Sequence, residues 1–78
     1  MATATRTVIS DEEIERELAT LDDNDRAKLN RFTRIELERM GYMSTREGGR
    51  TWEKAERNVI RHLLEREMRV RDVEERED

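Results

Sequence analysis

The side chains best suited to chemistry in this sequence are the arginines and one asparagine in its middle part. An arginine can pair with guanine through two hydrogen bonds, an asparagine can pair with adenine in the same way, and either can hydrogen-bond a phosphate. Some of these residues share one side of a helical wheel, and others flank a pair of glycines. The candidate nucleic-acid-binding residues are Lys28, Asn30, Arg31, Arg34, Arg46 and Arg50.

Catalytic chemistry has little support in the sequence. A catalytic acid or base needs a cleft that shifts its pKa, and a chain of 78 residues can build little of one. The single histidine, His62, lies among arginines, and Ser10 and Ser44 are placed as helix caps or turn residues rather than as nucleophiles. We therefore expect no enzymatic activity and no small-molecule substrate.

Composition argues against further classes of function. The chain has no cysteine, so neither a disulfide nor a thiolate zinc site is available, and one histidine cannot form a histidine-rich metal site. We expect no metal and no cofactor. No segment approaches the roughly 20 apolar residues of a membrane span, and the N-terminus lacks the apolar run of a secretory signal. We therefore expect a cytoplasmic protein with no membrane partner.

The net charge of −4 is distributed unevenly along the chain. Residues 1–25 carry two basic side chains against eight acids, residues 26–71 carry thirteen against seven, and residues 72–78 carry one against five. A basic middle between acidic ends suits a nucleic-acid face, but the acidic ends can equally neutralise the basic helices within the fold or across a dimer. Both interpretations stay open.

A first helix is predicted over about residues 11–20. Ser10 and Glu13 have the spacing of a capping box, and Ile9 and Ile14 have that of a hydrophobic staple. Acidic residues crowd the first turn, where the helix dipole favours negative charge.

A second helix is predicted over about residues 25–40. Asp22 or Asp23 can cap its start. Gly41 can end it, because glycine readily adopts the left-handed conformation that follows many helices.

A third, long helix is predicted over about residues 52–73. Its apolar residues spread far beyond the roughly 100° that one docking face needs, which predicts contact with both its own subunit and a second copy. One core rarely gives a domain of this size more than roughly 3–5 kcal/mol, which also favours a partner subunit. We expect a homodimer whose interface contains Val59, Ile60, Leu63, Leu64 and Met68.

The chain as a whole is predicted to be mainly α-helical, with one small domain over residues 10–73. Residues 1–9 are predicted to form a flexible arm, and the acidic tail at residues 74–78 to fray, because its charge opposes the dipole at a helix C-terminus. Residues 42–51 have three interpretations. They form a small β-hairpin around Gly48-Gly49, since tyrosine, threonine and tryptophan favour strands, or an irregular loop. Alternatively the third helix begins early, because Ser44 and Glu47 have the spacing of a capping box, although the two glycines would then lie inside that helix.

Residues 12–52 loosely resemble the core of winged-helix DNA-binding regulators. The segment Glu13 to Ala19 is similar to a short helix of that family, Leu37 to Met43 to the end of its recognition helix, and Arg46 to Trp52 to a wing with a Gly-Gly-Arg tip. The resemblance implies that the helix arginines and Asn30 face the major groove and that Arg46 and Arg50 reach the DNA from the wing. The third helix would then dimerise and set the half-site spacing.

Two functions are expected on this basis. One is a homodimeric DNA-binding regulator that uses an arginine-rich helix and a wing. The other is a small helical module that binds another protein, as an adaptor or inhibitor such as phage or mobile-element accessory proteins, with no nucleic-acid contact. The structure of residues 42–51 separates the two, because the wing depends on it.

Overall fold

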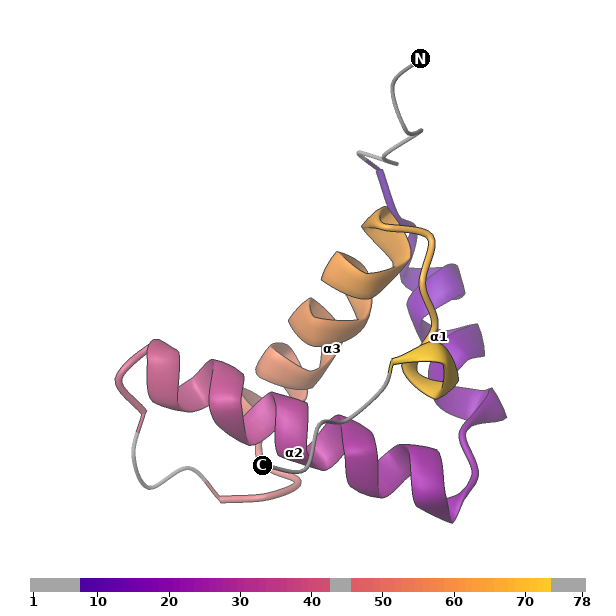
Figure 1. Ribbon diagram of the computed structural model, residues 1–78. Helices are drawn as coiled ribbons and strands as arrows, with labels where there is room; N and C mark the ends of the chain where they lie inside the picture. Colours follow the sequence, from indigo (N-terminus) through magenta and orange to yellow (C-terminus); the bar gives the residue numbers. More distant parts are fainter. Residues whose placement is uncertain (1–7, 43–45, 74–78) are drawn as a thin grey trace.

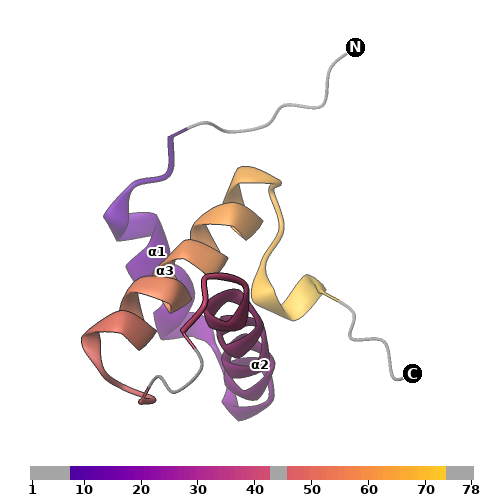
Figure 2. The same ribbon diagram turned by 90° about the vertical axis from the view of Figure 1, so that its left-hand side faces the viewer.

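A computed structural model of the chain describes residues 8–42 and 46–73. Its elements are the helices α1 (Asp11–Thr20), α2 (Asp23–Arg39) and α3 (Arg50–Glu65), followed by the short 3-10 turn η1 (Val70–Asp72). Figure 1 shows α1 and α3 rising from α2, and the segment after α3 returning towards it. In Figure 2, α3 crosses in front of α1 while α2 is seen almost along its axis. The predicted fold class, mainly α-helical, is confirmed.

The start of α1 follows the prediction. The Ser10 hydroxyl accepts a hydrogen bond from the Glu13 backbone N–H at 3.2 Å. Ile14 is fully buried, and Ile9 packs against the same core, as a hydrophobic staple requires. Ile9 therefore belongs to the packed domain, although it was predicted to end the flexible arm. The rest of that arm, except Val8, and the predicted tail at residues 74–78 lie outside the described residues.

The two ends of α2 also have the predicted signals. Asp22 is the cap, because its carboxylate accepts a hydrogen bond from the Asp25 N–H at 2.8 Å. At the other end Gly41 has a φ of 89°. The Tyr42 N–H donates to the Leu37 carbonyl at 2.8 Å. This bond, closed through a left-handed residue, is a Schellman motif and ends the helix.

The predicted long helix at about residues 52–73 begins near its expected start, at Arg50, but is wrong at its C-terminal end, because α3 ends at Glu65. Glu67 has a φ of 59°, and its N–H donates to the Leu64 carbonyl at 2.9 Å. The Met68 N–H donates to the Leu63 carbonyl at 2.8 Å, so α3 ends in a second Schellman motif. The left-handed position is usually a glycine, and a glutamate there gives no stop signal in the sequence.

Replacing Glu67 with glycine should stabilise the protein by about 1 kcal/mol, because glycine adopts a positive φ without the steric cost that a side chain incurs. In a domain of this size that gain raises the thermal midpoint by roughly 4–8 °C. Thermal and urea unfolding followed by circular dichroism measure the change. The matched control is Glu65→Gly, which places the glycine at the last residue of α3, where φ is not positive, and should destabilise instead. A destabilised Glu67→Gly variant would contradict the account of this helix end.

The hairpin interpretation of residues 42–51 fails in the part that the structure describes. Arg50 and Thr51, its predicted second arm, are the first residues of α3. Before them the chain makes a turn, in which Gly48 has a φ of 82° and the Gly49 N–H donates to the Arg46 carbonyl at 3.2 Å. Tyr42 does not lie in a strand, and neither do residues 46–49. Residues 43–45 lie outside the described ranges. The loop alternative fits the described residues.

The core has two parts. The first brings together one fully buried residue from each element, and partly buried hydrophobic residues surround it. Its centre consists of Ile14, Leu29, Ile60 and Val70. The second part joins Leu37 of α2 to Trp52 and Ala55 at the start of α3. The pairing of α2 with α3 therefore spans both parts, whereas α1 and η1 contribute only to the first.

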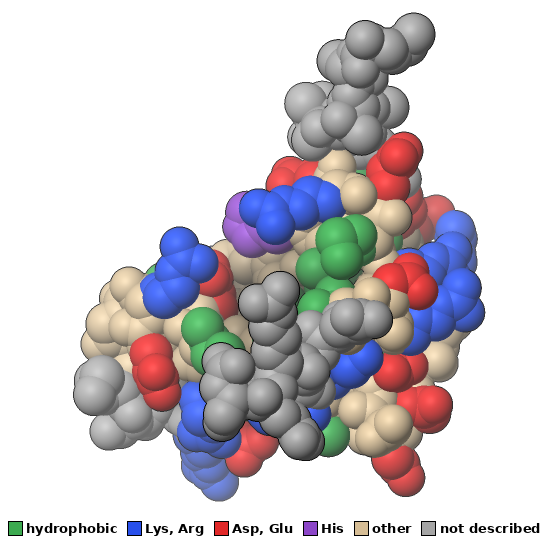
Figure 3. All heavy atoms as spheres, viewed as in Figure 1, with side chains coloured by type: hydrophobic (Ala, Val, Ile, Leu, Met, Phe, Trp, Pro, Cys, Tyr) green, Lys and Arg blue, Asp and Glu red, His purple; other side chains and the backbone are tan. Residues whose placement is uncertain are grey.

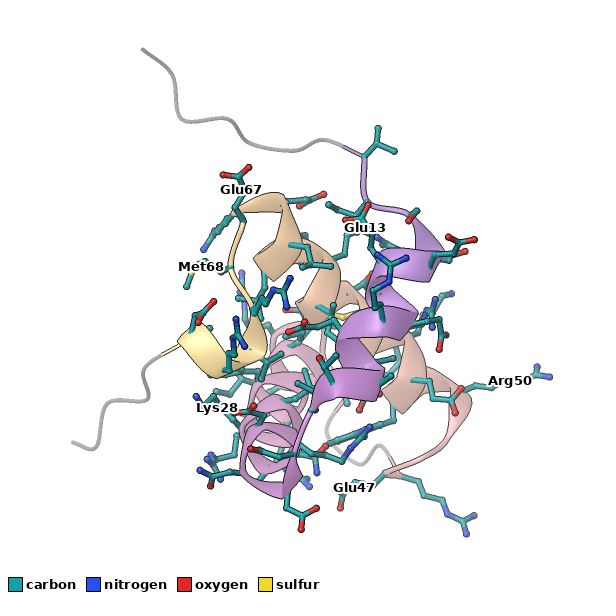
Figure 4. The ribbon with its side chains drawn as sticks, turned by 90° about the vertical axis from the view of Figure 1, so that its right-hand side faces the viewer. Glu13, Lys28, Glu47, Arg50, Glu67 and Met68 are labelled. Carbon is teal, nitrogen blue, oxygen red and sulfur yellow. The ribbon has the colours of Figure 1, made fainter. Side chains whose placement is uncertain are left out.

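The segment at residues 66–73, here called the C-terminal strap, is fastened by two side chains. Glu17 of α1 is only 6% exposed, and its carboxylate accepts a hydrogen bond from the Val70 N–H at 3.0 Å. Lys28 of α2 donates from Nζ to the Val73 carbonyl at 2.8 Å. Figure 4 shows Lys28 beside η1, and Glu67 and Met68 in the first part of the strap. The strap is thus an integral part of the fold.

Candidate functional site

The predicted nucleic-acid-binding residues do not share one surface role. Lys28 is half-buried, and its ammonium group donates to the Arg71 and Val73 carbonyls of the strap, so it is less available to a phosphate than the exposed arginines are. Asn30 is half-buried. Arg34 lies over the Trp52 ring at 5.6 Å from its centroid and 3.6 Å from the Glu47 carboxylate. This arginine therefore connects the loop before α3 to the second part of the core.

The remaining candidates are exposed. Arg31 lies on α2, and Arg46 and Arg50 flank the first turn of α3. In Figure 4, Arg50 projects away from the fold. The N-cap of α3 is Gly49. A glycine has no side chain that could accept a hydrogen bond from the backbone N–H groups of the first turn. Anions favour such an end because of its free N–H groups and the helix dipole.

Much of the acidic charge of α1 is met by α3 within the fold. Arg57 donates to the Glu15 carboxylate and forms an ion pair with Asp11 at 3.4 Å. The hydrogen bond to Glu15, and then that to Asp11, raises the pKa of Arg57 above its ordinary value. On the other side of α3, Glu56 lies 4.0 Å from Arg26 of α2. These contacts favour the interpretation in which acidic and basic segments neutralise each other internally.

The residues predicted for a dimer interface differ in their exposure. Ile60 is 0% exposed at the centre of the core, so its side chain leaves no surface for a second copy. Val59, Leu63 and Leu64 are half-buried and pack against that core. Met68 follows the end of α3 and belongs to the strap. The breadth of apolar surface that predicted a dimer is used mainly inside the subunit.

A groove lies between α2 and α3 and has a volume of about 460 Å³. Each helix contributes residues spaced i, i+3, i+4 and i+7, and one strap residue completes the lining. The lining consists of Phe32, Ile35, Glu36 and Arg39 on α2, Val59, His62, Leu63 and Arg66 on α3, and Val73. We call this site the α2–α3 groove.

The α2–α3 groove combines an apolar lining with a mostly basic rim. Ile35 is 53% exposed, which is unusual for an isoleucine that faces other apolar side chains. Arg39 and Arg66 are exposed, Glu36 is half-buried, and the His62 ring lies 3.3 Å from Glu65. On the face drawn in Figure 3, hydrophobic side chains lie near the histidine and among basic and acidic ones.

Sequence reasoning missed this groove, although its signal is present. The excess apolar surface of α3 predicts self-pairing, and the apolar side of α2 by itself predicts no binding site. Neither stripe reveals that the two meet, because their angle of crossing is set by packing.

Within residues 8–42 and 46–73, no group of three or more histidine, cysteine, aspartate or glutamate side chains is placed to hold a metal ion. None of the helices in this part of the chain has the length and apolar character needed to cross a membrane. The chain matches no family model, no curated protein and no solved structure with which it was compared.

Proposed function

We propose that this chain is a small non-enzymatic module that binds another protein through the α2–α3 groove. The observation that carries the proposal is the meeting of two stripes with identical spacing, one on each wall of a single groove. Fully burying an isoleucine side chain stabilises a protein or complex by roughly 1.5–3 kcal/mol. Because Ile35 is 53% exposed, about half of that stabilisation is available to a partner that covers it.

The charged residues support protein binding over DNA binding. Two of the basic residues proposed for DNA, Lys28 and Arg34, already hold parts of the fold. Acidic side chains also interrupt the exposed side of α2 and the loop before α3, as Glu38 and Glu47 do. Such acids repel phosphates and so weaken the electrostatic attraction on which most DNA affinity depends.

Replacing Ile35 with aspartate should abolish capture of the partner while leaving the domain folded. The immobilised chain is exposed to an extract of cells that produce it, and captured proteins are quantified by mass spectrometry. The matched control is Ala27→Asp, which adds the same charge at an exposed position on α2 outside the groove. A protein retained by the native chain and by Ala27→Asp, but lost with Ile35→Asp, supports the proposal.

DNA binding remains the second candidate function, favoured by Arg46 and Arg50 beside the uncapped end of α3. The same proteins are therefore also passed over immobilised duplex DNA. Retention that falls steeply between low and moderate salt, and that is equal for Ile35→Asp and the native chain, would favour DNA. Such retention, without any protein whose capture depends on Ile35, would contradict the proposed function.

A further inference from the structure

We propose that the occupant of the α2–α3 groove is an amphipathic helix of another protein, with acidic residues beside its apolar stripe. The inference rests on the proposed function and specifies its partner. It follows from the shape of the groove, from the charges on its rim, and from the poor fit of the occupants that this chain itself offers.

The form of the groove suits a helical occupant. Its two walls are helix surfaces that present Phe32 and Ile35 on one side and Val59 and Leu63 on the other, and such a groove can take the apolar face of an amphipathic helix. An extended peptide binds instead by adding a strand to a sheet edge. The described parts of the chain contain no strand, so no such edge is present there.

The charges on the rim indicate an acidic occupant. Each wall ends its stripe with an exposed arginine, Arg39 on α2 and Arg66 on α3, whereas the one acid in the lining, Glu36, is half-buried. Arginines on a rim select partners by complementary charge and speed their association. Acidic side chains beside an apolar stripe would complement this charge.

A second copy of this chain fits the groove poorly. Pairing two grooves face to face would bring four arginines together against two half-buried glutamates. The exposed side of α1 is acidic, but its accessible residues include Glu12, Glu15, Arg16 and Ala19, which offer no large apolar side chain. Residues 74–78 are acidic, yet they include no apolar residue and are too few to supply a stripe.

Three synthetic peptides of about 18 residues, long enough to form at least a partial helix, test the proposal. The first carries leucines at i, i+3, i+4 and i+7 with flanking glutamates, and the second has the same leucines with flanking lysines. The third keeps the glutamates but replaces the leucines with glutamines. Affinity is measured by fluorescence anisotropy, and the binding surface is mapped by amide chemical shifts.

The glutamate–leucine peptide should bind at least about tenfold more tightly than the lysine–leucine peptide at low salt, and the ratio should shrink as salt is added. The peptide without leucines should not bind, and Ile35→Asp should abolish binding. The charge-reversed variant Arg39→Glu with Arg66→Glu should prefer the lysine–leucine peptide. Both arginines are exposed, so this variant should keep the native circular dichroism spectrum. Its thermal midpoint should fall by a few degrees only, because each new acid opposes the dipole at a helix C-terminus.

Equal affinity for the glutamate and lysine peptides would overturn the acidic partner while leaving a helix-binding groove intact. Shifts that map outside the groove would overturn the site. A concentration-dependent dimer that Ile35→Asp abolishes would overturn the inference in favour of a second copy. The proposed function itself fails on a different result, namely that no captured protein depends on Ile35.

Discussion

Replacing Ile60 with alanine will leave much of the protein unfolded at 25 °C. Ile60 is 0% exposed and packs with Ile14, Leu29 and Val70 from the other three elements. Truncating a buried isoleucine to alanine costs roughly 2–5 kcal/mol, because transfer free energy is lost and a cavity remains. A domain of this size has only roughly 3–5 kcal/mol of stability to lose. Urea unfolding followed by circular dichroism measures the change.

The matched control for this prediction is Ile35→Ala. Ile35 is 53% exposed, so the same truncation removes less buried surface and should cost below about 1 kcal/mol. The comparison also separates two roles for Ile60. If Ile60 instead lay in a dimer interface, Ile60→Ala would change the sedimentation of the protein and leave a folded monomer. That result would contradict the place of Ile60 in the core.

Replacing Glu17 with alanine will release the C-terminal strap and destabilise the domain by about 2 kcal/mol, the scale of a hydrogen bond to a charged group. The Glu17 carboxylate accepts from the Val70 N–H at 3.0 Å, and Val70 is 0% exposed. Without Glu17 that buried N–H has no acceptor unless the strap moves. Two measurements follow the change, urea unfolding and the rate at which trypsin cleaves after Arg69 and Arg71.

The control variant is Glu15→Ala on the same helix. Glu15 pairs with Arg57 at an exposed position, and exposed ion pairs contribute at most about 1 kcal/mol. Its strap should resist trypsin as well as the native strap does. Equal cleavage rates in the Glu17 and Glu15 variants would show that Glu17 does not hold the strap.

The starts of α1 and α2 and the end of α2 could be predicted because local chemistry specifies them. Ser10 and Asp22 each cap a helix through a bond to a residue three positions on, and Gly41 adopts the left-handed conformation that glycine permits. The end of α3 could not be predicted in this way. Glu67 takes the same conformation without being a glycine, so tertiary packing has overridden its local preference.

The candidate site was harder to predict than the helices, because its residues depend on how the elements cross. Lys28 looked like a phosphate ligand until the strap supplied carbonyl acceptors for its ammonium group. Ile60 looked like a dimer contact until Val70 covered it from the strap. Neither result follows from helical periodicity. Periodicity predicts on which face of a helix a residue lies, but not which other segment packs against that face.

The hydrogen bond between Glu17 and Val70 joins segments that are 53 residues apart in the sequence. Ile14 of α1 and Val70 of the strap belong to one core cluster. When either segment detaches, the core residue of the other loses its cover. The two segments therefore form one cooperative unit for local unfolding. When that unit opens, α2 and α3 remain joined through Leu37, Trp52 and Ala55, so amide hydrogens in that pair exchange last.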